Sequence, residues 1–213
     1  MAGKIVGAGL VLACAAVTAA RAGAFHGQVG APEGSTRAHH PEDVIVWLEQ
    51  VPEKVETKLT GGGRHWFWQA PRKAPPMAAL TETGLHYAPR VSVVPAGQPL
   101  EIRNDDTVWH GTFSVSPGAA FELGKRAPGS VDTVRFATPG VVTLRCDIHP
   151  EMTGYVIVTP NHAFARPDSA GLWRLPDLPG GDYVVHAWRP DRGETKHAVH
   201  MPAHGDTLLT LRW

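Results

Sequence analysis

The sequence predicts an all-β protein. Short runs of alternating or β-branched residues recur along the 213-residue chain, and turn residues bound most of them. Glycine and proline are abundant, with 23 and 19 residues, and long helical patterns are absent. Many short strands separated by turn residues are typical of a β-sandwich or a β-barrel.

The expected strands follow one another along the chain, and each is a short apolar or alternating run. They cover residues 25–29, 44–48, 90–94, 99–103, 140–144, 155–158, 182–188 and 207–212. Between the second and third of these, residues 51–80 are irregular, with a charged stretch, three consecutive glycines, the aromatic cluster Trp66, Phe67 and Trp68, and several prolines. We interpret this segment as a long loop or an insertion.

Residues 1–24 have the composition of a secretory signal peptide. A short positive start precedes the apolar run 5–20, and Ala22 and Ala24 each end a small–x–small cleavage site. The run is too short and too rich in small residues for a good membrane span. We therefore expect cleavage near Ala22 or Ala24 and a periplasmic or secreted protein without a membrane span. A retained anchor and lipidation at Cys14 are the alternatives.

Cleavage would leave Cys146 as the single cysteine of an exported chain. Oxidising compartments favour disulfides, so an unpaired thiol there needs another role, and metal ligation is one. Cleavage would also leave 18 basic against 20 acidic side chains, a formal charge of about −2. Because nucleic acid requires a basic surface, we expect no nucleic-acid partner.

Four residues form a candidate metal site. Cys146, His149 and Met152 stand in one short segment with Cys-x2-His-x2-Met spacing, and His110 lies 36 residues before the cysteine. A thiolate, two imidazoles and a thioether are the ligands of a blue-copper site, with methionine as the weak axial ligand. A zinc site would need a further cysteine or histidine in closed spacing, and methionine is a poor zinc ligand. Strands on both sides would anchor the loop.

Three stretches also carry a family resemblance. They are residues 104–117, with Asn104 and His110; residues 121–124; and residues 139–150, which run into Cys146 and His149. Together they resemble the plastocyanin-like cupredoxins of the methylamine-utilisation type, and the loop 146–152 is similar to that of amicyanin. The resemblance is close over 81–159 and extends to 25–50, while 161–213 resemble the carboxypeptidase-regulatory-like (prealbumin-type) β-sandwich appended to such proteins.

The resemblance implies a fold and a function. It implies a cupredoxin Greek-key β-sandwich over 25–159, with an N-terminal extension and the long loop, followed by a second small sandwich over 161–213. It also implies one type 1 copper ion and single-electron transfer to an exported redox partner such as a cytochrome or a dehydrogenase. Gly111, where such proteins often carry asparagine, and Glu151, where such loops are apolar, depart from the pattern and predict a wetter or less rigid centre.

Two other functional classes stay open. The protein could bind copper without turnover, as a chaperone or a storage module, or it could be an interaction protein that keeps the fold. We expect no enzyme, because the sequence holds no Ser-His-Asp order, no glycine-rich phosphate loop and no paired carboxylates with a reason to be close.

Further candidates have ordinary alternatives. His197, His200 and His204 are close in sequence and would form a second copper site only if they met, although spacing of three places His197 and His200 on opposite faces of a strand. His86 is expected to lie at a strand edge. Loading of metal by the histidines at 39, 40 and 65 and docking at the Trp66–Trp68 cluster are the remaining functional hypotheses.

Overall fold

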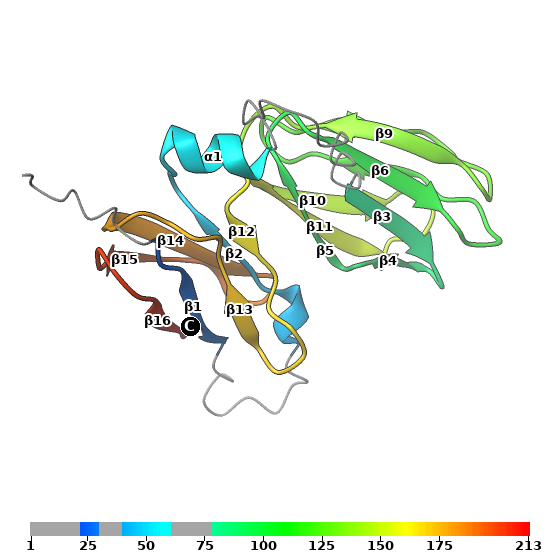
Figure 1. The fold of residues 1–213 in the computed structure, drawn as a ribbon. Coiled ribbons are helices and arrows are strands. Elements are labelled where there is room, and N and C mark those ends of the chain that lie inside the picture. Colours follow the sequence, from blue (N-terminus) through cyan, green and yellow to red (C-terminus); the bar gives the residue numbers. More distant parts are fainter. Residues whose placement is uncertain (1–21, 30–39, 61–77) are drawn as a thin grey trace, which may run out of the picture.

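The computed structural model describes residues 22–29, 40–60 and 78–213. The all-β prediction is confirmed, because the described residues form strands in four sheets, with only the 3-10 turn η1 (Pro41–Asp43) and the short helix α1 (Glu53–Leu59) beside them (Figure 1). In these three ranges, no helix is both long and apolar enough to cross a membrane. The predicted signal peptide falls almost wholly outside the described residues.

Two sheets in the middle of the chain form the first sandwich. One sheet has the order β4 (His86–Ala88), β3 (Ala78–Thr83), β6 (Pro99–Asn104) and β9 (Val131–Arg135). The other has the order β5 (Val91–Pro95), β11 (Thr153–Thr159), β10 (Gly140–Cys146), β7 (Thr112–Ser114) and β8 (Phe121–Glu122). Leu80, Leu100 and Ile102 of the first sheet and Leu144 and Val156 of the second pack into one core.

Two further sheets form the second sandwich. The smaller sheet has the order β13 (Leu172–Arg174), β1 (Phe25–Val29) and β16 (Thr207–Leu211). The larger one has the order β12 (Phe164–Ala165), β2 (Ile45–Leu48), β14 (Gly181–Arg189) and β15 (Gly193–Met201). Phe25, Trp173 and Leu211 of the smaller sheet pack on Val185 and Met201 of the larger one.

The pairing of β1 and β2 corrects the predicted domain bounds. Strand β1 lies parallel to β16 and antiparallel to β13, and β2 lies between β12 and β14. The N-terminal strands therefore belong to the second sandwich, and the placement of residues 25–50 with the first was wrong. The second sandwich is built from both ends of the described chain, with residues 78–159 inserted between its strands, because strand pairing joins segments far apart in sequence.

The predicted long loop at 51–80 is correct only in part. Helix α1 occupies residues 53–59, and β3 begins at Ala78. Residues 61–77, which hold His65 and the Trp66–Trp68 cluster, lie outside the described residues. Strands with charged or polar residues on one face, such as β9 and β15, were not predicted, because half of their side chains are exposed and they carry little apolar pattern.

The two sandwiches meet at a seam, which we define as the buried cluster of Ile45, Trp47, Val91, Ile157 and Trp188. Strand β2 is buried at all of its positions because alternate side chains face the second core and the seam. The rings of Tyr155 and Trp188 lie 5.1 Å apart across this seam. Hydrophobic clusters thus separate the four sheets into successive layers, with the seam in the middle (Figure 1).

Candidate metal centre

Strand ends of the first sandwich bring three of the predicted ligands together. His110 stands just before β7 and forms an isolated bridge with Arg126, in which each backbone N–H donates to the other's carbonyl, at 3.1 and 2.7 Å. Cys146 is the last residue of β10 and pairs with Thr112 of β7. His149 lies in the loop from β10 to β11. A backbone ladder therefore sets the position of the cysteine relative to the first histidine.

The donor atoms of these residues form a nearly regular triangle. Cys146 Sγ lies 3.8 Å from Nδ1 of His110 and 3.8 Å from Nδ1 of His149, and the two Nδ1 atoms are 3.2 Å apart. The point equidistant from all three atoms is about 2.1 Å from each, close to the usual metal bond lengths of about 2.0 Å to imidazole and 2.3 Å to thiolate. The spacing of the three donor atoms therefore fits one metal ion.

Solvent reaches this triangle unevenly. His110 is 0% exposed and Cys146 is 3% exposed, whereas His149 is only half-buried. The two residues on strand ends are thus shielded by protein, and the loop histidine faces the surface. Among the four candidate ligands, His149 is therefore the one nearest to solvent.

Gly111 joins the ligand loop to the strand that follows His110. Its N–H points at Cys146 Sγ, with a nitrogen–sulfur distance of 3.4 Å, and its carbonyl accepts a hydrogen bond from the Asp147 N–H at 3.0 Å. A Cβ on Gly111 would lie 1.8 Å from Asp147 Oδ1, so a larger residue would displace this side chain. A donor aimed at sulfur stabilises negative charge there. The glycine that departs from the family pattern therefore secures the loop through its backbone.

Asp106 holds the outer edge of the His110 ring. Its Oδ2 lies 3.1 Å from His110 Nε2 and accepts the Leu85 N–H at 2.9 Å. The Leu85 hydrogen bond, followed by the hydrogen bond from His110, keeps the pKa of the Asp106 carboxyl below its ordinary value. A carboxylate on one imidazole nitrogen leaves the lone pair of the other for a metal. Asp106 was not among the site residues predicted from the sequence, although its position four residues before His110 is a usable signal.

Met152 lies in the same loop and is 1% exposed. Its N–H donates to the His149 carbonyl at 3.0 Å, which tightens the turn between them. It packs in the core that also contains Cys146. Its role as axial ligand stays a prediction. Glu151 beside it is exposed, so its carboxylate lies at the solvent side of the loop.

A buried polar network lies behind the triangle and was also missed. Arg126 donates to Glu82 Oε2 at 2.9 Å and to Asp132 Oδ2 at 2.6 Å, and the Glu82 carboxylate accepts the Thr112 hydroxyl. The Tyr87 hydroxyl lies 3.0 Å from the Thr112 hydroxyl, and burial raises the pKa of Tyr87 well above its ordinary value. The backbone of Arg126 pairs with that of His110, and the backbone of Thr112 pairs with that of Cys146. The network therefore supports the strand ends that carry the site.

The other candidate histidines have separate surroundings. His86 is exposed on β4 and its Nδ1 contacts the Gly84 carbonyl at 3.0 Å. On β15, His197 Nε2 lies 3.2 Å from the Thr195 hydroxyl and His200 Nδ1 lies 2.7 Å from Asp182. Within the described ranges, the only group of three or more histidine, cysteine or acidic residues placed to hold a metal ion is His110, Cys146 and His149. The second copper site at the C-terminal histidines does not form.

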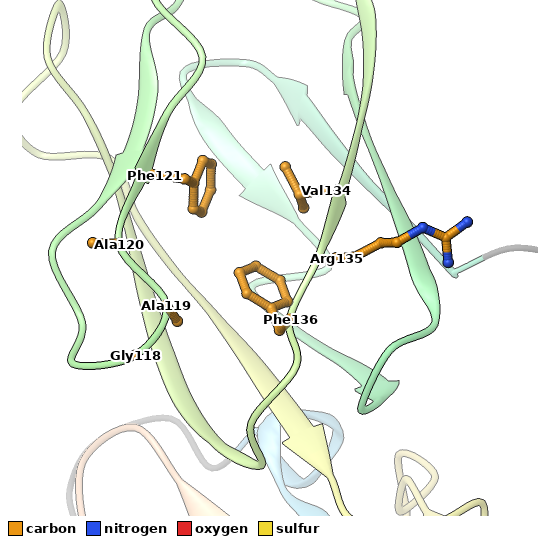
Figure 2. Close-up of a pocket in the computed structure, with 7 residues that line it drawn as sticks. All are labelled: Gly118, Ala119, Ala120, Phe121, Val134, Arg135 and Phe136. Atoms are coloured by element: carbon orange, nitrogen blue, oxygen red, sulfur yellow. The ribbon is translucent and has the colours of Figure 1, made fainter.

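The first sandwich also contains a hollow of about 240 Å³ between residues 118–121 and 134–136. Figure 2 shows the side chains of Phe121, Val134 and Phe136 gathered around it, with the Arg135 guanidinium directed away. The two phenylalanine rings are 5.8 Å apart, and Arg135 donates to the Gly97 carbonyl at 2.9 Å. None of the three metal-site residues lines this hollow, so it is separate from the centre.

No family model and no curated protein matches the chain. Among solved structures, the chain is similar to a purple cupredoxin from Nitrosopumilus maritimus, with 24% identity over 38% of this chain and 99% of that one and a TM-score of 0.35. A copper-containing nitrite reductase from Thermus scotoductus SA-01 has 21% identity over 46% of this chain but only 26% of its own, with a TM-score of 0.40. The Cu(I) form of an amicyanin mutant has 20% identity over 40% of this chain and 85% of its own, with a TM-score of 0.37.

Proposed function

We propose that the protein is an exported type 1 copper protein that carries single electrons between redox partners. One copper ion would be held by His110, Cys146 and His149, with Met152 as axial ligand. The observation that carries this proposal is the triangle of Sγ and two Nδ1 atoms, whose centre is one metal bond length from each corner. Copper in such a set exchanges one electron between Cu(I) and Cu(II) with little rearrangement of its ligands.

The contacts that hold the candidate ligands in place favour electron transfer over copper delivery. Asp106 orients His110, Gly111 donates to Cys146, and the strand pair β7–β10 positions both residues. A preorganised ligand set lowers the rearrangement that an electron transfer requires. A chaperone, by contrast, must open its site to pass the ion on, and here only His149 is half-buried among the three residues.

The surface around His149 supports docking of a redox protein. Trp109, 55% exposed, Val108 and Ile148 are exposed apolar side chains next in sequence to the site, and Pro150 is exposed beside them. Grouped exposed apolar residues mark interaction sites, and electron-transfer encounters use small interfaces below about 1,200 Å². We propose that an exported cytochrome or dehydrogenase docks here and exchanges electrons through the His149 edge.

For an exported chain, the contacts of the first described residues favour cleavage after Ala22 over cleavage after Ala24. Gly23 exchanges two backbone hydrogen bonds with Leu178, at 3.0 and 2.6 Å, and the buried Ala24 donates to Asp206 Oδ1 at 2.9 Å. Cleavage after Ala24 would remove these contacts, whereas cleavage after Ala22 keeps them. We expect the intact mass of the exported protein to correspond to a chain that begins at Gly23. A chain beginning at Phe25 or a retained leader would contradict this.

The function is tested by visible spectroscopy and voltammetry of the purified protein loaded with copper. We expect an intense thiolate-to-copper absorption band and a reversible one-electron wave. Tight Cu(I) binding without a band after oxidation would instead support a chaperone or a storage module. A protein that retains no copper would leave only an interaction role, and the proposal would be wrong.

A further inference from the structure

A group of polar side chains, His186, Glu194 and Glu49, lies at the edge of the seam, away from the candidate metal centre. On β14, Val185 and Ala187 face the second core, so His186 between them points to the opposite side of the sheet. There its ring lies against Trp47 of the neighbouring strand, with centroids 5.1 Å apart and planes inclined by 30°. The His186 side chain is only 7% exposed. An imidazole in this position needs polar partners.

Glu194 satisfies one of the two ring nitrogens. Its Oε1 lies 2.5 Å from His186 Nδ1. A neutral imidazole that donates Nδ1–H to a carboxylate keeps its lone pair on Nε2, which is the arrangement of histidines that ligate metals. In the part of the chain that the structure describes, the buried Nε2 atom has no hydrogen-bond partner. The ring therefore presents an unpaired lone pair that is already oriented by a carboxylate on its other side.

Glu49 is the carboxylate on the Nε2 side of the His186 ring. Its Oε2 is 4.0 Å from Nε2, which is too long for a hydrogen bond. Bonds of about 2.0–2.1 Å to nitrogen and 2.0–2.2 Å to oxygen span this gap when they lie almost in line, and a small movement of the Glu49 side chain toward His186 would allow the smaller angle of a tetrahedral ion. Half of the Glu49 side chain is exposed, so an ion can enter from its side.

A cavity of about 280 Å³ contains these groups. Residues of both sandwiches line this cavity. The first sandwich contributes Pro139, Gly140 and Val158, the second contributes Trp47, Glu49, His186 and Glu194, and Pro160 lies in the connection between the two. We propose that His186 Nε2 and the Glu49 carboxylate bind one divalent first-row cation such as Zn²⁺, with Glu194 as the residue that orients the imidazole. Imidazole and carboxylate together suit such ions, and water would complete the coordination. This proposal does not depend on the copper centre.

Zinc titration of the full exported chain tests the proposal, with copper already loaded into the first centre. We expect calorimetry to show Zn²⁺ binding that His186→Gln and Glu49→Gln each weaken at least ~tenfold. His200→Gln is the matched control, because His200 also contacts a carboxylate, Asp182, on the same pair of strands but is exposed. We expect this variant to bind Zn²⁺ as the wild type does.

The thermal unfolding midpoint gives a second test that remains valid even if His186→Gln does not fold. Glu49 is half exposed, so Glu49→Gln leaves the buried ring and its neighbours in place. Zn²⁺ should raise the thermal unfolding midpoint of the wild type and of His200→Gln, but not that of Glu49→Gln. Absence of Zn²⁺ binding, equal affinity in all four proteins, or an equal loss in His200→Gln would overturn the proposal.

Discussion

Asp106 Oδ2 lies 3.1 Å from Nε2 of the His110 ring, while Nδ1 of the same ring lies 3.8 Å from Cys146 Sγ. The carboxylate also accepts the Leu85 N–H, so it is itself held in place. The orientation of the most buried candidate ligand is therefore set by a residue outside the ligand set. Mutation of such outer partners typically lowers metal affinity by about 10–100-fold.

Asp106→Ala should lower copper affinity by about 10–100-fold, because His110 loses the group that fixes its ring and its lone pair. Competition with a copper chelator measures the change. Asp106→Asn should recover part of the loss, since its amide oxygen can still accept a hydrogen bond. The neighbouring exposed Asp105, 3.8 Å from Arg103, provides the control, and Asp105→Ala should leave the affinity unchanged. Equal losses at both positions would mean that Asp106 acts only on overall stability.

Cys146→Ser should abolish the coloured site. Cys146 is the only free thiol among the described residues, and a serine hydroxyl cannot form the thiolate–copper bond. The measurement is a visible spectrum of the copper-loaded variant beside that of the wild type. Retention of an intense band would refute the assignment of the centre.

Met152→Gln should keep copper bound and lower its reduction potential. An axial thioether favours Cu(I), whereas an amide oxygen favours Cu(II). Voltammetry of the variant and the wild type gives the difference directly. If the potential does not change, Met152 is not the axial ligand, and the adjacent Glu151 becomes the next candidate despite its exposed position.

Pro150→Lys should slow electron transfer to an exported cytochrome without changing the visible spectrum. Pro150 is exposed next to the half-buried His149, and a charge within a small transient interface alters the encounter. Stopped-flow rates measure the effect. Leu208→Lys is the control, because Leu208 is 70% exposed on the second sandwich. If Pro150→Lys has no effect but a change at Trp66 or Trp68 slows the reaction, the aromatic cluster is the docking site.

Arg126→Met should destabilise the protein by about 3–5 kcal/mol, because removal of one partner leaves a charge buried without compensation. Here that charge is the Glu82 carboxylate, which is fully buried and 2.9 Å from the guanidinium. Arg103→Met should cost less than about 1 kcal/mol, because Arg103 pairs with Glu101 near the surface. Urea unfolding of the three proteins compares the free energies. A loss below about 1 kcal/mol for Arg126→Met would show that water can solvate the Glu82 carboxylate once the guanidinium is removed.

The amino-acid sequence alone was enough to predict a candidate metal site. The spacing of Cys146, His149 and Met152 within one loop is local, so the loop between two strands can be recognised from residues that are neighbours in the chain. The apolar runs of β2, β10 and β11 are equally local, because burial requires apolar side chains at each position or at every second one. These features account for the correct all-β prediction and for the presence of Cys146 and His149 in one loop.

Only the tertiary structure decided which segments share a sheet and which polar groups meet. The pairing of β1 with β16 brings together residues 182 positions apart, as the Ala24–Asp206 hydrogen bond illustrates, and no periodicity encodes such a partner. The contacts of Glu82 with Arg126 and of His186 with Glu194 likewise cannot be predicted from the sequence, because a lone charged residue in a strand has the same pattern whether it faces solvent or a buried partner. Side-chain periodicity records which face is buried, whereas the identity of the neighbour depends on how distant strands assemble.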